Sequence, residues 1–149
     1  MERQGPDKGD EPRLLPVSLD ISALRCQCHA WHVPKTQAVA GLIVFTGTFR
    51  LGSAGRDDAR FIAWRINELA DLRMPARIAG LLVDLRGLDY QWGDDLGIWP
   101  LSLPDTAPVL ALVRPEQIAP LKGVLGDECL RVDARAAFAE ISDRIRDLR

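Results

Sequence analysis

The hydrophobic and polar positions of the chain change period several times, and this pattern predicts strands that alternate with helices. Residues 14–33 are loosely extended, and apolar and polar side chains alternate over residues 24–30, as in a half-buried strand. The nearly continuous apolar runs within residues 38–49 and 78–85 indicate strands that are buried on both faces. We expect residues 78–85 to form the centre of a sheet and the first two strands to pair as an antiparallel hairpin.

The first helix is predicted to follow a loop at residues 52–55, where glycine is frequent. Asp57 and Asp58 place negative charge where a helix N-terminus carries partial positive charge. Apolar residues at spacings of three and four form its buried stripe: Ala59, Ile62, Ile66 and Leu69. Met74 and Pro75 are expected to close this helix.

Three further helices are predicted in the second half of the chain. A short helix precedes Pro100, a second begins at Pro115, and a third begins after a cap at Asp133. Strands at residues 109–113 and 129–132 separate them. The resulting order predicts an α/β fold, with a single mixed, mostly parallel sheet of about five strands and about four helices packed on it.

The composition is that of one globular domain. The chain has 149 residues, of which 47% are apolar and 27% charged, so it can bury a core without disulfides. Residues 1–13 combine Gly, Pro and mixed charges, which predicts a flexible N-terminal tail ahead of a single domain at residues 14–149. Because the formal net charge is -2 and the arginines are scattered among carboxylates, nucleic acid is not an expected partner.

The terminal sequence and the cysteines bear on the cellular compartment. The N-terminus has no apolar stretch like that of a secretory signal, and no later segment is long enough to span a bilayer. The three cysteines, Cys26, Cys28 and Cys129, cannot all pair with one another, which favours a reducing compartment. We therefore expect a cytoplasmic protein without a membrane span.

The segment that ends the central strand resembles a known family. Residues 83–90 read VDLRGLDY and are similar to the aliphatic strand, followed by Asp-Leu-Ser-Gly-Val and an aromatic, of STAS domains. STAS domains occur as anti-sigma factor antagonists and at the cytoplasmic end of sulfate transporters. The element order extends the resemblance over residues 24–148. It implies a STAS-like fold and a bacterial regulatory module that binds another protein, without catalysis and without a cofactor.

The chain departs from this family at its phosphorylation site. The family continues with Asp-Ser-Ser-Gly-Leu-Gly, in which a serine at a helix N-terminus is phosphorylated, whereas residues 92–97 read WGDDLG. Asp94 falls at the position of that serine, so a phosphoserine switch is not expected. A carboxylate there is favoured by the helix dipole and the first-turn amides. Asp94 is then either a simple helix cap or a permanent phosphate-like contact for a partner.

We predict that residues 90–99 contact the partner protein. Large aromatic side chains in a loop are typical of interfaces, and carboxylates orient a bound partner. The predicted contact residues are Tyr90, Trp92, Asp94, Asp95 and Trp99. The alternative for the aromatic side chains is that they fold back over the edge of the sheet. Association of the chain with itself stays open.

Two other functions remain as alternatives. Residues 90–96 read YQWGDDL, which is also similar to Phe-Ser-Ala-Gly-Ala-Asp-Leu of the crotonase family, whose glycine amide helps to form an oxyanion hole. This resemblance implies a crotonase-like acyl-CoA (acyl-thioester) binding protein or enzyme, with a second amide from residues 49–55. The chain is, however, much shorter than a complete crotonase, and no acid–base pair is evident. A small acidic domain also suits a toxin-neutralising immunity protein.

No metal site is predicted. Four candidate ligands lie close together in the sequence: Cys26, Cys28, His29 and His32. Their spacing differs from that of common zinc sites, and a strand would direct the two cysteines to one face and His29 to the other. We expect core cysteines and a surface histidine. Four aspartates follow the central strand without a phosphate-binding glycine motif: Asp84, Asp89, Asp94 and Asp95.

Overall fold

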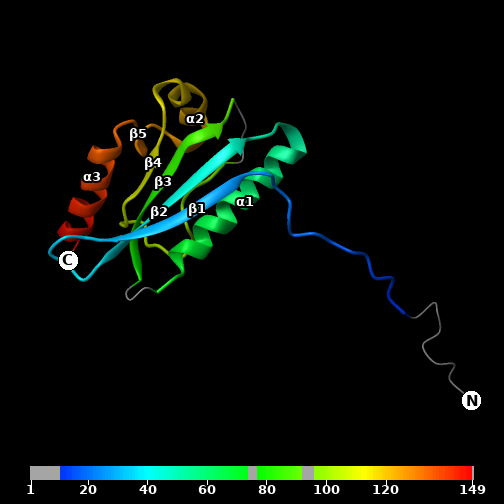
Figure 1. Cartoon of the computed structure of the whole chain (residues 1–149), viewed down its shortest axis with the longest axis horizontal. Helices are drawn as coiled ribbons and strands as arrows, with labels where there is room; N and C mark the ends of the chain where they lie inside the picture. Colours follow the sequence, from blue (N-terminus) through cyan, green and yellow to red (C-terminus); the bar gives the residue numbers. More distant parts are fainter. Residues whose placement is uncertain (1–10, 74–76, 92–95, 149) are drawn as a thin grey trace, which may run out of the picture.

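The computed structural model describes residues 11–73, 77–91 and 96–148 of the chain (Figure 1). Five strands form one sheet, and their order in space is their order in the chain: β1 (Arg25–His32), β2 (Val39–Thr48), β3 (Ile78–Asp89), β4 (Val109–Leu112) and β5 (Leu130–Arg131). β1 is antiparallel to β2, and all following pairs are parallel. The prediction of an α/β fold with a single mixed, mostly parallel sheet is confirmed.

The described residues contain three α-helices and one 3₁₀ turn. These are α1 (Gly52–Ala70), α2 (Ile118–Leu125), α3 (Ala134–Asp147) and η1 (Pro115–Gln117). The prediction of four helices is wrong, because residues 96–100 are not helical. Their side chains alternate between buried and exposed, which is the period of an extended segment and not of a helix.

Helices cover the sheet on both faces (Figure 1). α1 and α2 pack on one face together with the segment 96–107, and α3 packs on the other face. The predicted buried stripe of α1 is confirmed, since all four of its residues are buried. β3 lies in the middle of the sheet. Leu81 and Val83 are buried on the α1 face and Leu82 on the α3 face, so the predicted central strand is confirmed.

β1 and β2 form the predicted antiparallel hairpin. The amide of Val33 donates to the carbonyl of Ala38 at 2.9 Å, and Lys35 adopts a φ of 66° inside this turn. Pairing then runs from His32↔Val39 to Arg25↔Thr46 without a register shift. A short local turn therefore sets the register of all eight residues of β1.

β3 is longer than predicted. The loop expected from Arg86 onward is still strand as far as Asp89, because these residues pair with the end of β2, Gly87 with Thr46 among them. A Cβ on Gly87 would lie 2.8 Å from Cγ2 of Thr46, so glycine permits this close approach. The predicted end of the central strand is wrong by four residues for this reason.

α1 begins at Gly52, so the predicted loop at residues 52–55 is the first turn of the helix. A Cβ on Gly55 would lie 2.2 Å from the carbonyl oxygen of Arg50, and only glycine allows this turn to pack so closely on the preceding chain. The helix ends at Ala70. Met74 and Pro75, which were expected to close it, lie outside the described residues.

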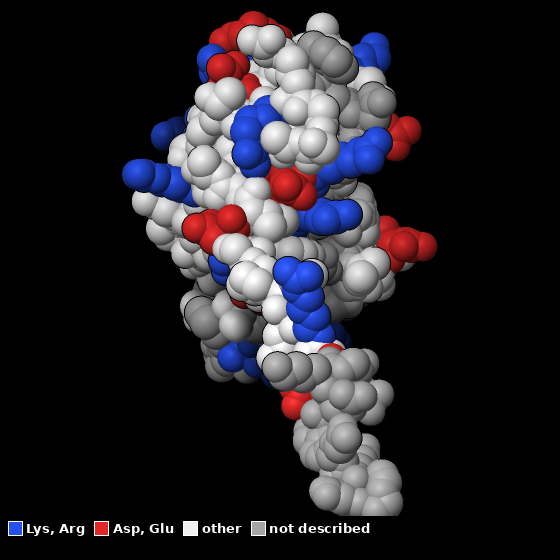
Figure 2. All heavy atoms as spheres, turned by 90° about the vertical axis from the view of Figure 1, so that its right-hand side faces the viewer, with Lys and Arg blue, Asp and Glu red and all other residues white. Residues whose placement is uncertain are grey.

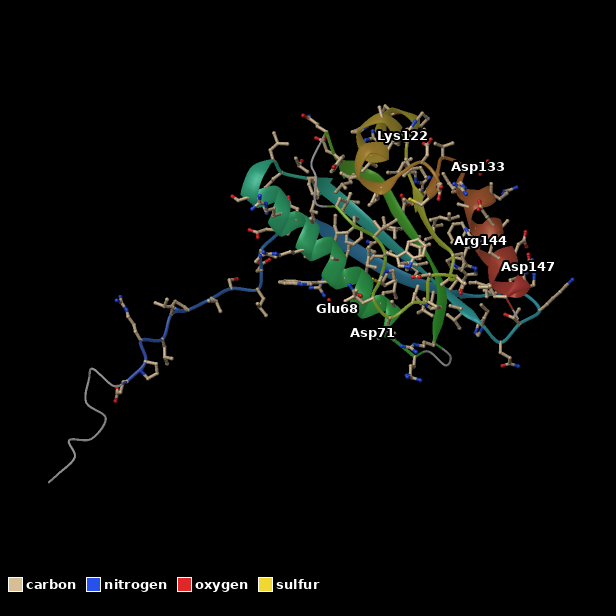
Figure 3. The ribbon with its side chains drawn as sticks, turned by 180° about the vertical axis from the view of Figure 1, so that it is seen from behind. Glu68, Asp71, Lys122, Asp133, Arg144 and Asp147 are labelled. Atoms are coloured by element: carbon tan, nitrogen blue, oxygen red, sulfur yellow. The ribbon has the colours of Figure 1, made fainter. Side chains whose placement is uncertain are left out.

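The C-terminal helix α3 begins as predicted. Asp133, labelled in Figure 3 beside the start of α3, accepts a hydrogen bond from the amide of Ala136 at 3.1 Å. This contact satisfies one of the free amides of the first turn and confirms the predicted cap. None of the helices in the described part of the chain is long and apolar enough to cross a membrane.

Candidate functional site

The residues predicted to contact a partner belong to the segment that leaves β3. Trp92, Asp94 and Asp95 lie outside the described residues. The ring of Tyr90 is only 4% exposed and packs edge-on against Phe49, with ring centroids 4.9 Å apart. Trp99, by contrast, is 46% exposed. Of the two predicted residues that the structure describes, Trp99 alone presents a large part of its side chain to solvent.

Residues 96–101 lie against the core as an extended segment whose side chains alternate between buried and exposed. Leu96, Ile98 and Pro100 are buried, whereas Trp99 and Leu101 are exposed, Leu101 to 93%. Because alternate residues of an extended segment point to opposite sides, the inward residues hold the segment on the core and direct Trp99 and Leu101 outward.

A side chain of α1 also fixes this segment. The amide of Leu101 donates to Oδ1 of Asn67 at 2.8 Å, and Nδ2 of Asn67 donates to the carbonyl of Ala63 within α1 at 2.8 Å. Further along, Leu103 and Ala107 are buried in the same core as α1. The exposed side chains of Trp99 and Leu101 therefore stand on a segment that is held at several points.

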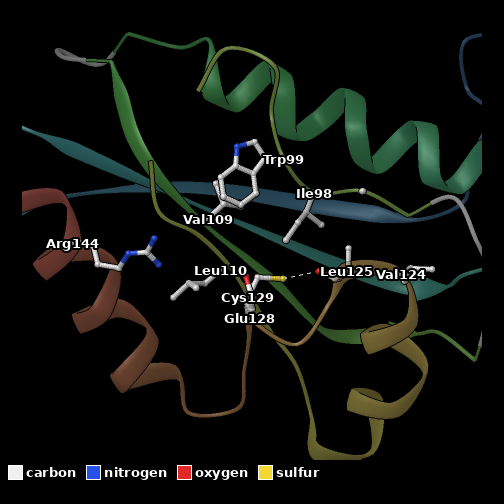
Figure 4. A pocket seen from close by; sticks show the side chains of 10 residues that line it. Ile98, Trp99, Val109, Leu110, Val124, Leu125, Glu128, Cys129 and Arg144 are labelled. Atoms are coloured by element: carbon white, nitrogen blue, oxygen red, sulfur yellow. Dashed lines mark hydrogen bonds between the residues drawn. The ribbon is translucent and has the colours of Figure 1, made fainter. Parts of the chain in front are cut away.

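Trp99 lines a cavity of 430 Å³ (Figure 4). The cavity lies between the segment just described, the start of β4, the end of α2 and α3. Six of its lining residues are large and apolar: Ile98, Trp99, Val109, Leu110, Val124 and Leu125. Its charged lining residues are Glu128 and Arg144. This volume and this lining are typical of small recognition pockets.

The short pairing of β5 explains why the cavity exists. β5 pairs with β4 only through Ala111↔Leu130 and Leu112↔Arg131, so the first two residues of β4 have no partner strand on that side. Gly126, with a φ of 80°, ends α2 and turns the chain away. The start of β4 and the chain that leads into β5 are therefore apart until the first pair, Ala111↔Leu130, and the cavity lies between them.

Arg144 supplies a cation to this cavity. It extends from α3, and its guanidinium points toward the apolar lining (Figure 4; Figure 3 shows the same residue on α3). Its ion pair with Glu140 is long, at 3.7 Å. Glu140 itself is bound at both carboxylate oxygens by Arg131, at 2.7 and 2.9 Å. Because Arg131 holds Glu140 so closely, Arg144 keeps hydrogen-bonding capacity for a bound group.

The same arrangement sets the charge of Glu140. The hydrogen bonds from Arg131 hold the pKa of the Glu140 carboxyl below its usual value, against the smaller opposing effect of burial. Glu140 is therefore ionised at neutral pH and stays paired with Arg131. Arg144 is the cation of this group that faces the cavity.

Cys129 lines the cavity but is not an activated nucleophile. Its thiol donates to the carbonyl of Leu125 at 3.5 Å, and burial raises its pKa, so the thiol is protonated at neutral pH. Both histidines lie in β1, at the opposite edge of the sheet, and cannot act as its base. Cys129 directly precedes β5 and is half-buried.

The cysteine and histidine cluster of β1 differs from expectation in one respect. Cys26 is half-buried against the core on the α1 face, but Cys28 is exposed, so the expectation of two core cysteines is wrong for Cys28. The reason is that β1 is an edge strand that α1 covers only in part. Within the described residues, no group of three or more His, Cys, Asp or Glu side chains is placed to hold a metal ion.

Two amides of the segment that a crotonase-like site would need are already bonded. The amide of Phe49 donates to the carbonyl of Asp89 at 3.0 Å, and that of Arg50 donates to Oδ2 of Asp58 at 2.8 Å. Gly93 and Asp94, which would supply the other amide, lie outside the described residues. The amides of Phe49 and Arg50 are therefore not free to donate to an oxyanion.

Asp58 has a different role from the one predicted. Its side chain is fully buried and accepts hydrogen bonds from Ser22 at 2.6 Å and from the side chain of Arg50 at 2.7 and 3.0 Å. Burial by itself would raise the pKa of this carboxyl, but the hydrogen bonds from Arg50 and Ser22 lower the pKa below its usual value. Arg50 also donates to the carbonyl of Ile21, so this group ties the chain before β1 to α1.

Charges on the surface are mixed in sign. On the face shown in Figure 2, basic and acidic side chains lie interspersed without an extended area of one sign. Comparison of the chain with protein-family models, with curated proteins and with solved structures finds no match.

Proposed function

We propose that the chain is a non-catalytic protein-recognition module of the cytoplasm whose partner contacts Trp99 and Leu101 and inserts an apolar side chain into the adjacent cavity. The observation that carries this proposal is the exposure of two large apolar side chains on a segment that is fixed to the core, directly beside an apolar cavity. Binding energy at interfaces is concentrated in such sites, with tryptophan among the residues that contribute most.

Charge specifies the partner further. Arg144 lies on the α3 side of the cavity, and a carboxylate next to the inserted side chain would pair with it. Glu128 lines the same cavity and repels a second carboxylate on its own side. The partner surface that fits is thus an apolar side chain with one acidic neighbour.

The resemblance to anti-sigma factor antagonists is part of this proposal. A five-stranded mixed sheet with helices on both faces supports it, and the absence of a serine at position 94 implies binding that needs no phosphorylation switch. Tyr90 is left out of the contact surface because its ring lies in the core. Trp92, Asp94 and Asp95 remain in it as predictions from the sequence.

The chain contains a matched pair of tryptophans for the test. Trp64 on α1 is 44% exposed and Trp99 is 46% exposed, but only Trp99 lines the cavity. The tagged full chain, Trp99→Ala and Trp64→Ala are used to capture proteins from the native host, and each purified partner is then titrated by calorimetry. We expect Trp99→Ala to weaken the partner's affinity by about 2 kcal/mol, roughly thirtyfold, and Trp64→Ala to leave it unchanged. Equal effects of the two variants contradict the proposal.

Two further titrations separate the alternatives. Arg144→Ala should weaken the same partner roughly tenfold if a carboxylate is bound there. The double variant Trp92→Ala and Asp94→Ala tests in the same assay whether these two residues contact the partner, as the sequence predicts. Octanoyl-CoA is titrated against the full chain while tryptophan fluorescence is recorded. Saturable quenching that Trp99→Ala abolishes would favour an acyl-thioester ligand over a protein partner.

A further inference from the structure

The free edge of β1 is the longest uncovered strand edge of the described structure. β1 pairs with β2 on one side, and no described strand pairs with its other side. Six of its eight residues are exposed: Arg25, Gln27, Cys28, His29, Ala30 and His32. In a strand the amide and carbonyl of every second residue point to the same edge, so this edge offers unpaired backbone donors and acceptors in strand geometry.

Apart from the charge of Arg25, β1 has none of the features that usually prevent strands from pairing at an edge. It contains no proline and no lysine, its pairing with β2 has no bulge, and Arg25 is its only residue among Arg, Lys, Asp and Glu. Protected edges are short, bulged or charged. The opposite edge, β5, is protected in this sense, because it is only two residues long.

The sequence of β1 is complementary to itself. A twofold axis perpendicular to the sheet keeps each face on its own side, so residues directly opposite each other must point to the same face. An axis at Cys28 satisfies this rule and places Cys26 opposite Ala30 and Cys28 opposite its own copy, so that small side chains meet at the centre of the α1 face, with His32 opposite Leu24 at its ends. On the α3 face the same axis places Gln27 opposite His29, and Arg25 opposite the ring of Trp31.

We propose that two copies of this chain associate through β1, with the strands antiparallel about a twofold axis at Cys28, so that the two sheets become one continuous sheet. The occupant of the edge is a second copy because, in this register, every residue of β1 except His32 faces another β1 residue, and His32 faces Leu24 directly before the strand. This surface is at the opposite edge of the sheet from the cavity beside Trp99, so both can be occupied at once.

The association is tested with the full chain under reducing conditions by sedimentation velocity over a range of concentrations. We expect a dimer, and Cys28→Lys should raise its dissociation constant at least roughly tenfold, because two ammonium groups would face each other across the axis. Ala136→Lys is the matched control, since it adds the same charge at an exposed site in the first turn of α3, which follows β5 at the opposite edge of the sheet, and it should leave the dimer intact. Circular dichroism checks that both variants are folded.

Cross-linking tests the position of the axis. A variant that keeps only Cys28 (Cys26→Ser, Cys129→Ser) is oxidised with diamide, which takes two electrons and two protons from the two thiols as the disulfide forms. We expect a dimer on non-reducing gels that a reductant reverses. The variant that keeps only Cys26 (Cys28→Ser, Cys129→Ser) should not cross-link, because Cys26 faces Ala30.

Three results would overturn the proposal. The first is a chain that is monomeric at every concentration. The second is a dimer that Cys28→Lys leaves intact. The third is cross-linking through Cys26 in place of Cys28. Replacement of Leu14, Leu15 and Val17 by serine examines the other exposed apolar segment, and a dimer lost in that variant alone belongs to the N-terminal segment and not to β1.

Discussion

β1 and β5 end the same sheet at opposite sides and differ in length, in cover and in what they leave open. β1 pairs with its neighbour over eight residues, and its outer edge is exposed. β5 pairs over two residues and is followed directly by α3. The open feature is therefore a row of backbone groups at β1, and an apolar cavity with Trp99 beside it at β5.

The difference follows from how each strand is connected. β1 reaches β2 through a short turn, so register and length are set locally. β5 reaches β4 through η1, α2 and a loop, and pairing begins only where this crossover returns to the sheet. The long free edge of β1 is thus suited to binding another strand. The cavity beside the short strand β5 is suited to binding a side chain.

The largest predicted effect concerns the group that holds the chain before β1. Asp58→Ala should reduce the free energy of unfolding by about 3 kcal/mol, because it leaves Arg50 and Ser22 without their buried acceptor. Urea denaturation measures this change. Asp57→Ala is the control, since its side chain is 42% exposed, and it should cost less than about 0.5 kcal/mol. Equal losses would show that the buried group does not hold β1.

The corresponding group on the β4 side should contribute somewhat less. Gln117 is 2% exposed and donates to the carbonyls of Leu85 and Leu88 at 2.8 and 2.7 Å, while its own carbonyl accepts from the amide of Arg114. Gln117→Ala should cost about 2 kcal/mol in urea denaturation, because these buried groups lose their partners. Glu116→Ala, at an exposed neighbour, is expected to be nearly neutral. A neutral Gln117→Ala would refute this role.

Acid should lower the free energy of unfolding by protonating Asp58, whose carboxylate ties the chain before β1 to α1. Because the pKa of Asp58 is lowered in the folded protein, its stabilising contribution is complete above the unfolded-state pKa of about 3.9 and is lost as pH falls through the folded-state pKa. The difference in unfolding free energy between the natural chain and Asp58→Asn should therefore be constant near neutral pH and shrink under acidic conditions. A difference that does not change as the pH falls would contradict the assignment.

The smallest effect on stability is expected beside the cavity. Leu101→Ser should change the free energy of unfolding by less than about 0.5 kcal/mol, because the side chain is 93% exposed. The same variant should weaken the partner captured through Trp99. A loss of stability above about 1 kcal/mol would mean that Leu101 is part of the core, and the proposed contact surface would have to be redrawn.

Local patterns predicted those elements whose burial has a clear period. The stripe of α1, the hairpin and the cap at Asp133 were predicted correctly, because period, turn and cap are each set within a few residues. The short helix before Pro100 was not, since WGDDLG has the composition of a helix start while the following residues are held in an extended form by the core. Tertiary packing overrides a weak local preference of this kind.

The candidate site was predicted only in part for the same reason. Trp99 was identified because large aromatic residues in loops are typical of interfaces. Arg144 and Glu128 were not identified, because they come from α3 and from the loop before β5 and meet only at the cavity. Nothing in the local sequence around Arg144 distinguishes it from the other arginines of α3.

The sequence by itself determined the class of fold, the order of its strands and the places of its three α-helices, but not the absence of a helix before Pro100, since the correct elements depend on the period of apolar residues and on nearby turn and cap residues. Only the tertiary structure decided that Asp58 is a buried acceptor, that Tyr90 is a core residue and that β5 pairs too late to close the cavity. Those outcomes depend on contacts between segments far apart in the chain, such as Ser22 with Asp58, and no local pattern records them.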